Sequence, residues 1–528
     1  MGVSVVLDEH TVRPEPNTTL YQCAETLGVR VPTSCFSQGK CRECLVEVTE
    51  GEDLLTPRSP EEEHLQGSFR LSCRARTIAG TGTICCSTLR RGALRIEEEA
   101  HHTVRPLDPS VERPTASGLL FGAALDLGTT AVVVRLHDLA SGEIVATQSF
   151  ENPQRFGGSD VMARIRYDSE HPGRLLRRTL LGYLGHALEA FPCRTEEIVE
   201  LVVAGNSTMR DLMFGLDVST IGVHPYRSLT ELSRRRGEQA STHLETSAKK
   251  LRLPMQKEAV VYGLPLIASH VGADIAAGLL ACGFANGEDV CVLMDIGTNT
   301  EIVVGNRNCL LAASCPAGPA FEGGAIRCGM PALTGAIERV QLGDDGSVSH
   351  NVIGGGAPKG ICGSGLVDLL GELARTGQMN PQGRFDDDLE GVFQVDQTHD
   401  VSFSEHDVNE LAQAKGATIA GLRLVLREYG VKLDEVAHLY LAGGFARHLD
   451  LDAARRIGLL PSLPDERIIK VGNAALEGAS RVLLSIAERR RLEQLVLRIG
   501  HLQLETQPDF FDVFVDGCQF TPVEEVAP

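Results

Sequence analysis

Residues 291–304 read Cys-Val-Leu-Met-Asp-Ile-Gly-Thr-Asn-Thr-Glu-Ile-Val-Val, and the architecture of the chain can be built outward from them. A short apolar run ends near Asp295, a polar turn follows, and a second apolar run begins at once. This pattern predicts a strand, a tight turn and a second strand. The turn residues Gly297, Thr298 and Asn299 offer N–H groups and a hydroxyl to an anion. Asp295, at the strand end, is placed to hold the magnesium ion of a nucleotide through waters.

The same pattern occurs earlier, in residues 121–134, which read Phe-Gly-Ala-Ala-Leu-Asp-Leu-Gly-Thr-Thr-Ala-Val-Val-Val. Asp126, Gly128, Thr129 and Thr130 stand at the matching places. One such motif is weak, because any hairpin can carry Asp and Gly in its turn. Two copies in the same context predict an internal duplication into two lobes, each with a phosphate-binding hairpin; two unrelated hairpins are the alternative. A strand follows each glycine turn, which excludes the Rossmann and Walker loops.

The paired hairpins resemble the phosphate-1 and phosphate-2 motifs of the actin-like ATPase superfamily, which includes acetate and sugar kinases. That superfamily also has a Gly-Gly adenosine loop late in the chain. Residues 439–446, Leu-Tyr-Leu-Ala-Gly-Gly-Phe-Ala, are similar to it, with Gly443 and Gly444 in the loop. The resemblance implies duplicated ribonuclease-H-like sheets that bind ATP and Mg²⁺ between two lobes, with Asp126 and Asp295 as catalytic residues.

Length and charge narrow the function classes. A chain of 528 residues should form about three or four domains. Its 50 Lys and Arg against 70 Asp and Glu give a net charge of -20, which argues against nucleic acid or an anionic membrane as partner. No apolar run is long enough to cross a membrane, and the N-terminus does not resemble a signal peptide. We therefore expect a cytoplasmic protein, whose 15 cysteines indicate metal or redox chemistry before disulfides.

Four cysteines near the N-terminus have the spacing of an iron–sulfur site. Three follow the pattern C-x5-C-x2-C, and the fourth comes after 28 intervening residues. They are Cys35, Cys41, Cys44 and Cys73. The spacing lies close to the plant-type [2Fe–2S] pattern. Zinc is the main alternative, although it prefers two C-x2-C pairs and only one is present. The pair Cys85–Cys86 could replace Cys73 as the fourth ligand, while a buried structural role is the other interpretation of that pair.

Residues 1–95 resemble a ferredoxin of the ubiquitin-like β-grasp type. The resemblance implies that Cys73 reaches the cluster from the side opposite the three close cysteines. The chain departs from the usual ferredoxin pattern at Phe36 and Arg42, where relatives carry glycine. That departure bears on the exposure and the potential of the cluster and leaves the ligand assignment unchanged.

The remaining chain divides at changes in composition. Residues 96–118 contain an acidic run, two histidines and three prolines, and predict a tether between domains. Residues 119–290 are expected to form the first actin-like lobe and residues 291–528 the second. Within the first lobe, residues 216–258 carry clusters of Arg and Lys and are interpreted as a solvated insertion that could offer a docking edge to a partner.

Two loops allow two interpretations each. Asn206 follows an apolar strand, so its side chain either faces the cleft or caps the next helix. Gly363 and Ser364 lie in a glycine loop before an apolar helix, which suits phosphate at a helix N-terminus or close packing of that helix. Glu301 is either a general base or a solvent-facing strand residue. The sequence leaves each pair of alternatives open.

Taken together, the domains resemble the ATP-dependent reductive activators of corrinoid proteins, which join an N-terminal [2Fe–2S] ferredoxin domain to an actin-like ATPase. The motifs that carry the resemblance span nearly the whole chain. They are residues 126–130, 204–206, 295–299, 318–324, 360–365, 443–445, 472–479 and 510–514. The resemblance implies an enzyme that hydrolyses ATP and reduces cob(II)alamin to cob(I)alamin on the corrinoid subunit of a methyltransferase system. Its electrons would come from an upstream donor through the cluster.

Physical reasoning favours this division of labour. A plant-type cluster has a potential of about -400 mV, and each 59 mV uphill costs about a factor of ten for one electron. Two lobes that close on a nucleotide supply a two-state element. Closure could change the ligation of the corrinoid, the environment of the cluster or the affinity for the partner. The alternative from another class is a redox-regulated small-molecule kinase of the acetate and sugar kinase superfamily. A non-catalytic scaffold ranks last, because it would leave Asp126 and Asp295 without a role.

Overall fold

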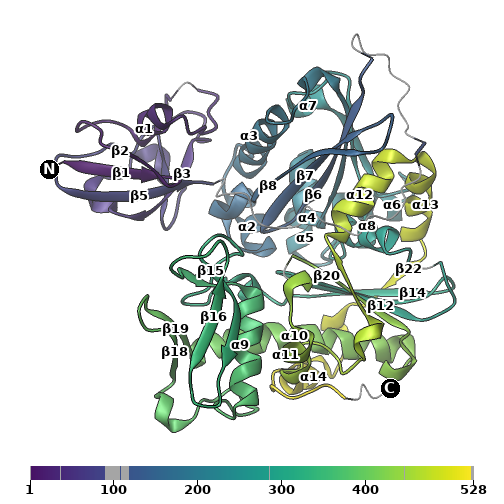
Figure 1. Ribbon diagram of the computed structural model, residues 1–528. Coiled ribbons are helices and arrows are strands. Elements are labelled where there is room, and N and C mark those ends of the chain that lie inside the picture. The colour runs from purple at the N-terminus through teal and green to yellow at the C-terminus, as the bar shows by residue number, and fades with distance from the viewer. Residues whose placement is uncertain are drawn as a thin grey trace.

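The structure is a computed structural model that describes residues 2–35, 37–89, 107–108, 118–284, 286–444 and 446–524. The expected tether at residues 96–118 lies almost wholly outside the described residues, as do Phe36 and Phe445. A small N-terminal domain lies beside two larger lobes, one stacked on the other (Figure 1). Among the described residues, no helix has the length and apolar character needed to span a membrane.

The N-terminal domain is a five-stranded sheet crossed by one helix. Its strands, in spatial order, are β2 (His10–Val12), β1 (Val3–Leu7), β5 (Gly82–Thr88), β3 (Leu45–Glu50) and β4 (Phe69–Leu71). The terminal strands β1 and β5 pair in parallel, and the other pairs are antiparallel. Helix α1 (Leu20–Leu27) begins with a capping box at Thr19 and ends at Gly28, whose φ of 71° favours glycine. This is the expected β-grasp arrangement.

Each large lobe is built on a six-stranded sheet; five of the strands share one topology, and the sixth lies at opposite edges of the two sheets. The first consists of β10 (Leu244–Ser247), β11 (Val260–Gly263), β9 (Ile198–Gly205), β6 (Phe121–Leu127), β7 (Ala131–Asp138) and β8 (Ile144–Glu151). The second consists of β21 (Ile468–Gly472), β20 (His438–Ala442), β12 (Cys291–Ile296), β13 (Thr300–Gly305), β14 (Leu310–Cys315) and β22 (Ile499–His501). In both, three antiparallel strands in chain order are extended by parallel strands beside the first. The predicted duplication is confirmed.

Strand register places the two predicted aspartates at equivalent positions. Asp126 is the penultimate residue of β6 and lies opposite Ala204 of the parallel strand β9. Asp295 is the penultimate residue of β12 and lies opposite Ala442 of β20. Each aspartate therefore reaches the same edge of its own sheet, directly before the glycine turn.

Helices cover the faces of both sheets. In the first half of the chain they are α2 (Val161–Glu170), α3 (Leu175–Glu189), α4 (Ser207–Phe214), α5 (Ser219–Gly222), α6 (Leu229–Arg235), α7 (Ala248–Leu251) and α8 (Ala273–Ala281). In the second half they are α9 (Gly363–Arg375), α10 (Glu405–Tyr429), α11 (Leu451–Arg456), α12 (Ala474–Leu484), α13 (Ile486–Val496) and α14 (Phe510–Gly517). Helix α12 packs against α8 and against β6 and β9 of the first sheet. Residues 291–528, expected as the second lobe, thus also supply a helix to the first.

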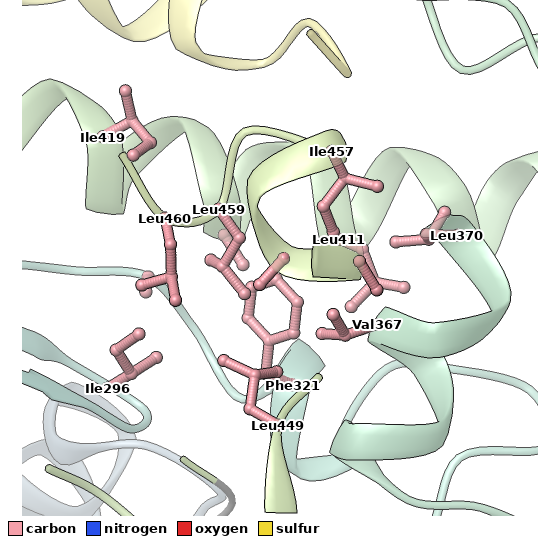
Figure 2. Packing of buried hydrophobic residues seen from close by; sticks show 14 of the residues in the cluster. Ile296, Phe321, Val367, Leu370, Leu411, Ile419, Leu449, Ile457, Leu459 and Leu460 are labelled. Carbon is pink, nitrogen blue, oxygen red and sulfur yellow. The ribbon is translucent and has the colours of Figure 1, made fainter. Parts of the chain in front are cut away.

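Two small sheets extend the second lobe. They are β15 (Ala336–Leu342), β16 (Val348–Val352) and β17 (Gly360–Ile361), and the pair β18 (Val392–Asp396) and β19 (Val401–Ser404). The core of this lobe gathers Ile296, Phe321 and residues of α9, α10 and the turn after α11 (Figure 2). Because Ile296 ends β12 and Phe321 precedes Glu322, the core fixes two elements of the cleft.

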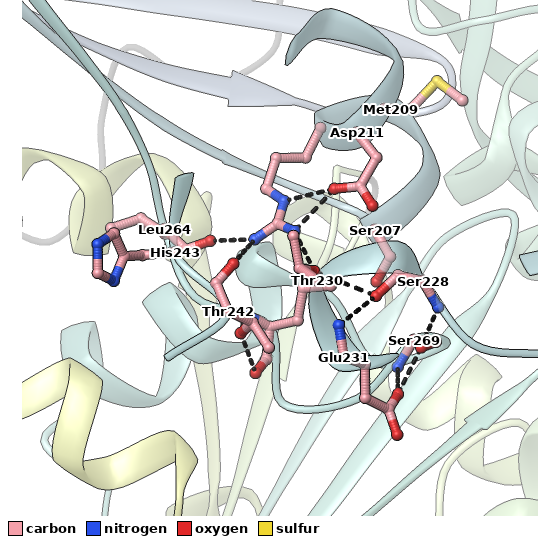
Figure 3. Close-up of polar contacts among 12 residues, drawn as sticks. Ser207, Met209, Asp211, Ser228, Thr230, Glu231, Thr242, His243, Leu264 and Ser269 are labelled. Carbon is pink, nitrogen blue, oxygen red and sulfur yellow. Dashed lines mark hydrogen bonds and ion pairs between the residues drawn. The ribbon is translucent and has the colours of Figure 1, made fainter. Parts of the chain in front are cut away.

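Residues 216–258 are integrated into the first lobe. Strand β10 pairs with β11 at the sheet edge, and Ile221, Ala248 and Leu251 are buried. The buried Arg210 of α4 ties this segment down: its guanidinium donates to the carbonyl oxygens of Thr242 and Leu264 (Figure 3). The interpretation of the segment as a solvated insertion therefore fits only its exposed basic side chains.

Candidate functional site

A cleft between the two sheets brings the predicted nucleotide-site residues together. It encloses about 1470 Å³ of empty space, counting its open mouth. Every residue predicted for catalysis or for nucleotide binding lines it. These are Asp126, Gly128, Thr129, Thr130, Asn206, Asp295, Gly297, Thr298, Asn299, Gly363, Ser364, Gly443 and Gly444. Residues more than 300 positions apart in the chain therefore share one cavity.

The two aspartates sit in a buried acidic environment. Burial raises the pKa of Asp126 to about 7, against the lowering effect of a hydrogen bond from Asn473. Burial also raises the pKa of Asp295 to about 8, and the nearby Asp274, Asp126 and Glu322 add to the shift. Asp274, at the start of α8, has a pKa of about 6 because it too is buried. A cation entering the cleft would favour the charged forms of all these carboxyls.

Glu322 joins the two phosphate hairpins. Its Oε2 accepts hydrogen bonds from the hydroxyls of Thr298 at 2.5 Å and Thr130 at 2.9 Å, and its Oε1 accepts from the Thr298 N–H at 3.1 Å. Its carboxylate thus occupies donors that the sequence assigned to phosphate. Burial raises the pKa of Glu322, while the two threonines act to lower it.

Asn206 combines its two predicted roles. Its side-chain oxygen accepts from the N–H of Met209 at 2.9 Å and caps α4. Its Nδ2 donates to the hydroxyl of Thr129 at 2.8 Å. Asn473 does the same in the second half of the chain: it caps α12 and donates to Asp126 Oδ2 at 2.9 Å. Each amide therefore fixes a helix start and a cleft residue together.

The glycine loops also serve packing and the cleft at once. Gly443 has a φ of 105°, and a Cβ there would collide with the carbonyl oxygen of Ile296. Gly365 allows α9 to approach Ile337 closely, while its neighbours Gly363 and Ser364 line the cavity. Close packing of the helix is confirmed at Gly365, while phosphate binding at Gly363 and Ser364 stays a prediction.

Glu301 is not the solvent-facing strand residue that one alternative required. It is buried and lines the cleft, and its Oε1 accepts from the Ser314 hydroxyl at 3.2 Å. Burial raises its pKa well above the usual value. Because Glu301 contacts neither hairpin threonine, Glu322 is the better placed carboxylate.

The donor set fits magnesium held mainly through its nucleotide. Within the part of the chain that the structure describes, no group of three or more His, Cys, Asp or Glu side chains converges on a metal position. Mg²⁺ usually keeps several waters and binds through one or two carboxylates together with substrate phosphates. Asp126 and Asp295 match that requirement.

The four predicted cluster cysteines lie in the N-terminal domain as two pairs. Cys44 and Cys73 Sγ are 3.2 Å apart, and both residues are buried. Cys35 interacts with Cys41 and accepts backbone N–H groups, which outweigh burial and lower its pKa to about 7. A [2Fe–2S] cluster takes four thiolates, two for each iron. Two thiol pairs match that requirement.

The alternative fourth ligands make other contacts. Both lie on β5, where the Cys85 thiol interacts with Glu50 and the Cys86 thiol with the carbonyl oxygen of Val6. Cys23 is buried in α1 and belongs to the core of the domain. Cys73 therefore remains the fourth residue of the set.

Sequence reasoning missed several cleft residues. Glu322 stands within the 318–324 motif, so the sequence indicated that this stretch matters. It did not indicate which role Glu322 has. Asp274 of the cleft had no signal, because it comes from a helix with an ordinary pattern, and the same holds for Arg164, which acts on Glu322 from outside the cleft lining. Arg164 is buried, and its charge acts on Glu322.

Comparison with known families covers most of the chain. Residues 6–77 match the "2Fe-2S iron-sulfur cluster binding domain". Residues 121–287 match the "RACo middle region", and residues 289–527 match the "C-terminal domain of RACo the ASKHA domain". The first match contains all four predicted cluster cysteines.

Individual relatives agree with these matches. The corrinoid activation enzyme RamQ of Eubacterium limosum is 31% identical over 430 residues, which cover 76% of this chain and 70% of RamQ. The [Co(II) methylated amine-specific corrinoid protein] reductase of Methanosarcina barkeri is 23% identical, over 75% of this chain and 76% of that protein. A solved reductive activator for a corrinoid, iron–sulfur protein aligns over 98% of both chains, with a TM-score of 0.71 and 27% identity.

Proposed function

This chain belongs to the family of corrinoid activation enzymes, and from that membership we propose that it uses ATP to reduce the Co(II) form of a protein-bound corrinoid to Co(I). The reduction consumes one electron for each cobalt, while ATP hydrolysis consumes one water and yields ADP and phosphate. The finer proposal is that the corrinoid subunit belongs to a methyltransferase system in the cytoplasm.

One observation carries the proposal: a cysteine set suited to [2Fe–2S] and a cleft suited to Mg-ATP occur in one chain. The cysteine pairs Cys35–Cys41 and Cys44–Cys73 would hold the cluster. When bound, that cluster supplies one-electron transfer from an upstream donor at about -400 mV. The chain's own residues bury three of the four sulfurs and direct backbone N–H groups at the fourth.

In the cleft, the hairpin threonines and turn amides would bind phosphate, while Asp126 and Asp295 would orient the magnesium and its waters. We propose Glu322 as the residue that positions the attacking water. Its carboxylate lies between the two hairpins, and burial moves its pKa toward neutrality, as a general base requires. Phosphate would have to displace Glu322 from the two threonines.

The test combines the anaerobic protein, a chemical reductant, Mg-ATP and a Co(II) corrinoid subunit of a methyltransferase system. Cob(I)alamin absorbance should appear with ATP. It should not appear without ATP, with Asp295→Ala or with Cys41→Ala. Equal reduction without ATP would contradict the proposal. Phosphorylation of a small molecule in a corrinoid-free mixture would favour the kinase alternative.

A further inference from the structure

Two arginines of the first ATPase lobe hold the cluster-binding side of the N-terminal domain. Arg178, on α3, donates from Nη2 to the carbonyl oxygen of Cys41 at 3.0 Å and to Glu43 Oε1 at 2.6 Å. The first acceptor belongs to the second cysteine of the predicted cluster set, and Glu43 lies between the second and third cysteines. An ATPase side chain therefore contacts the main chain of a cluster ligand.

Arg155 makes the second contact. Its Nη2 donates to Glu47 Oε2 at 2.6 Å, and its guanidinium carbon lies 5.4 Å from the centroid of the Phe69 ring. Glu47 lies on β3, which follows Cys44 directly. Within its own lobe Arg155 also pairs with Glu151 at 3.5 Å. The Arg155 and Glu47 side chains are only 16% and 15% exposed, so this pair is much less screened than a surface pair.

The short helix that carries Arg155 is bonded to the first phosphate hairpin. This helix, η3 (Pro153–Gly157), begins after Asn152, which is fully buried. The N–H of Asn152 donates to the carbonyl oxygen of Thr130 at 2.6 Å, and its Nδ2 donates to that of Gly128 at 2.7 Å. Only two residues thus separate Asn152, the hairpin's hydrogen-bond partner, from Arg155, which holds Glu47.

We infer that Arg155 and Arg178 are positioning residues that dock the cluster-binding loop on the ATPase, and that Asn152 links this docking to nucleotide bound at the hairpin. The linkage rests on the proposed nucleotide site. Phosphate bound by the turn residues would shift the carbonyls of Gly128 and Thr130, and their bonds to Asn152 would carry the shift into η3.

Arg155 can release Glu47 of the N-terminal domain because it also pairs with a second carboxylate, that of Glu151. A partly buried arginine that loses its only partner is costly, but Arg155 keeps Glu151 when Glu47 leaves. The interface also includes one buried contact and one surface contact: Leu89 N–H donates to the Tyr183 hydroxyl at 3.2 Å, and Arg30 pairs with Glu189 on the surface. The nucleotide state would thus set how freely the cluster approaches a protein partner.

Swapping the charges of Arg155 and Glu47 by mutation tests this docking pair in the absence of nucleotide. Hydrogen exchange of residues 41–47 is compared in the full-length, cluster-loaded protein with Arg155→Glu, with Glu47→Arg and with both changes. Each single change should speed exchange by about tenfold, as loss of a partly buried ion pair predicts, and the double change should restore protection. Arg166→Glu is the matched control, because Arg166 pairs with Glu170 on an exposed face of α2. Iron content and visible absorbance verify that each variant is folded. Lack of rescue, or an equal effect of the control, would overturn the docking role.

A non-hydrolysable ATP analogue with Mg²⁺ tests the linkage. Its binding is first measured by calorimetry, and exchange of residues 41–47 is then compared with and without it. The analogue should change this exchange in the wild type and in Arg166→Glu. In Arg155→Gln it should still bind, with an affinity altered by no more than the factor by which it changes the wild-type exchange, and it should leave the exchange as it was. Binding without any change in the wild type would overturn the linkage alone. Failure of the analogue to bind would contradict the proposed function and the linkage together, whereas the charge-exchange result would still stand.

Discussion

Glu322 is the side chain whose replacement best separates ATP binding from ATP hydrolysis. Glu322→Gln keeps the shape and can still bond Thr130 and Thr298, but it cannot accept a proton from water. We expect ATP turnover to fall by about 10²- to 10⁴-fold with nucleotide affinity nearly unchanged. Glu301→Gln, a second cleft carboxylate without threonine contacts, is the control. Normal turnover in Glu322→Gln would reject the assignment.

The raised pKa values of the cleft aspartates predict a pH dependence. Mg²⁺ needs ionised carboxylates, and burial raises the pKa of Asp126 to about 7 and of Asp295 to about 8. Below these values the groups are protonated and must release protons when the metal binds. Affinity for Mg-nucleotide should therefore rise between about pH 6 and pH 8. Calorimetry in two buffers of different ionisation enthalpy should detect proton release, reduced in Asp295→Asn. Binding with no proton release at pH 7 would contradict the prediction.

The cysteine pairs predict which thiols hold iron. Cys73→Ala removes the partner of Cys44 and should abolish the visible absorbance of the cluster, with less than two irons per chain. The double change of Cys85 and Cys86 to Ala should leave the absorbance intact, because those thiols contact Glu50 and Val6 instead. Iron analysis and absorption spectra of the anaerobic proteins check both results. Zinc in a colourless native protein would contradict the [2Fe–2S] assignment.

At the scale of elements, the contact between α8 and α12 supports the cleft from behind, because the N-cap of α12 is the cleft residue Asn473. A Cβ at Gly478 would collide with the carbonyl oxygen of Ala277, whereas a Cβ at Gly278 would make ordinary contacts with the Ala474 methyl at 3.5 Å and Leu293 Cδ2 at 3.6 Å. Gly478→Ala should destabilise the protein by about 1–3 kcal/mol through overpacking. Gly278→Ala, on the same interface, should be nearly neutral. The Tm of each variant is measured by thermal unfolding, monitored by circular dichroism. Equal shifts of the two Tm values would show that this packing is less tight than described.

At the scale of the whole molecule, the two hairpins should act as one ATPase whose turnover responds to a corrinoid partner. Asp126→Ala and Asp295→Ala should each abolish hydrolysis while iron content stays normal, because the cluster lies in another domain. Addition of the Co(II) corrinoid subunit should change wild-type turnover, as measured by phosphate release. Turnover that ignores the partner and depends on a small-molecule acceptor would identify a kinase.

Much of this architecture was accessible from sequence because its signals are local. The hairpins around Asp126 and Asp295 alternate apolar runs with glycine turns, and the cysteine spacing reflects one loop that wraps a cluster. Such patterns depend on short stretches of backbone, so they predicted both lobes, the N-terminal domain and a set of nucleotide-site residues that all line the cleft.

Tertiary structure alone decided the contacts between distant segments. Glu322 reaches Thr130 across 192 positions, Asn473 reaches Asp126 across 347, and Arg178 reaches Cys41 across 137. Helix α12 comes from the second half of the chain and packs on the first sheet. No local periodicity encodes such pairings, because they arise when the buried faces of separate elements meet. The sequence by itself thus determined which elements form and which chemistry they carry, while packing determined which carboxylate, amide and arginine complete the site.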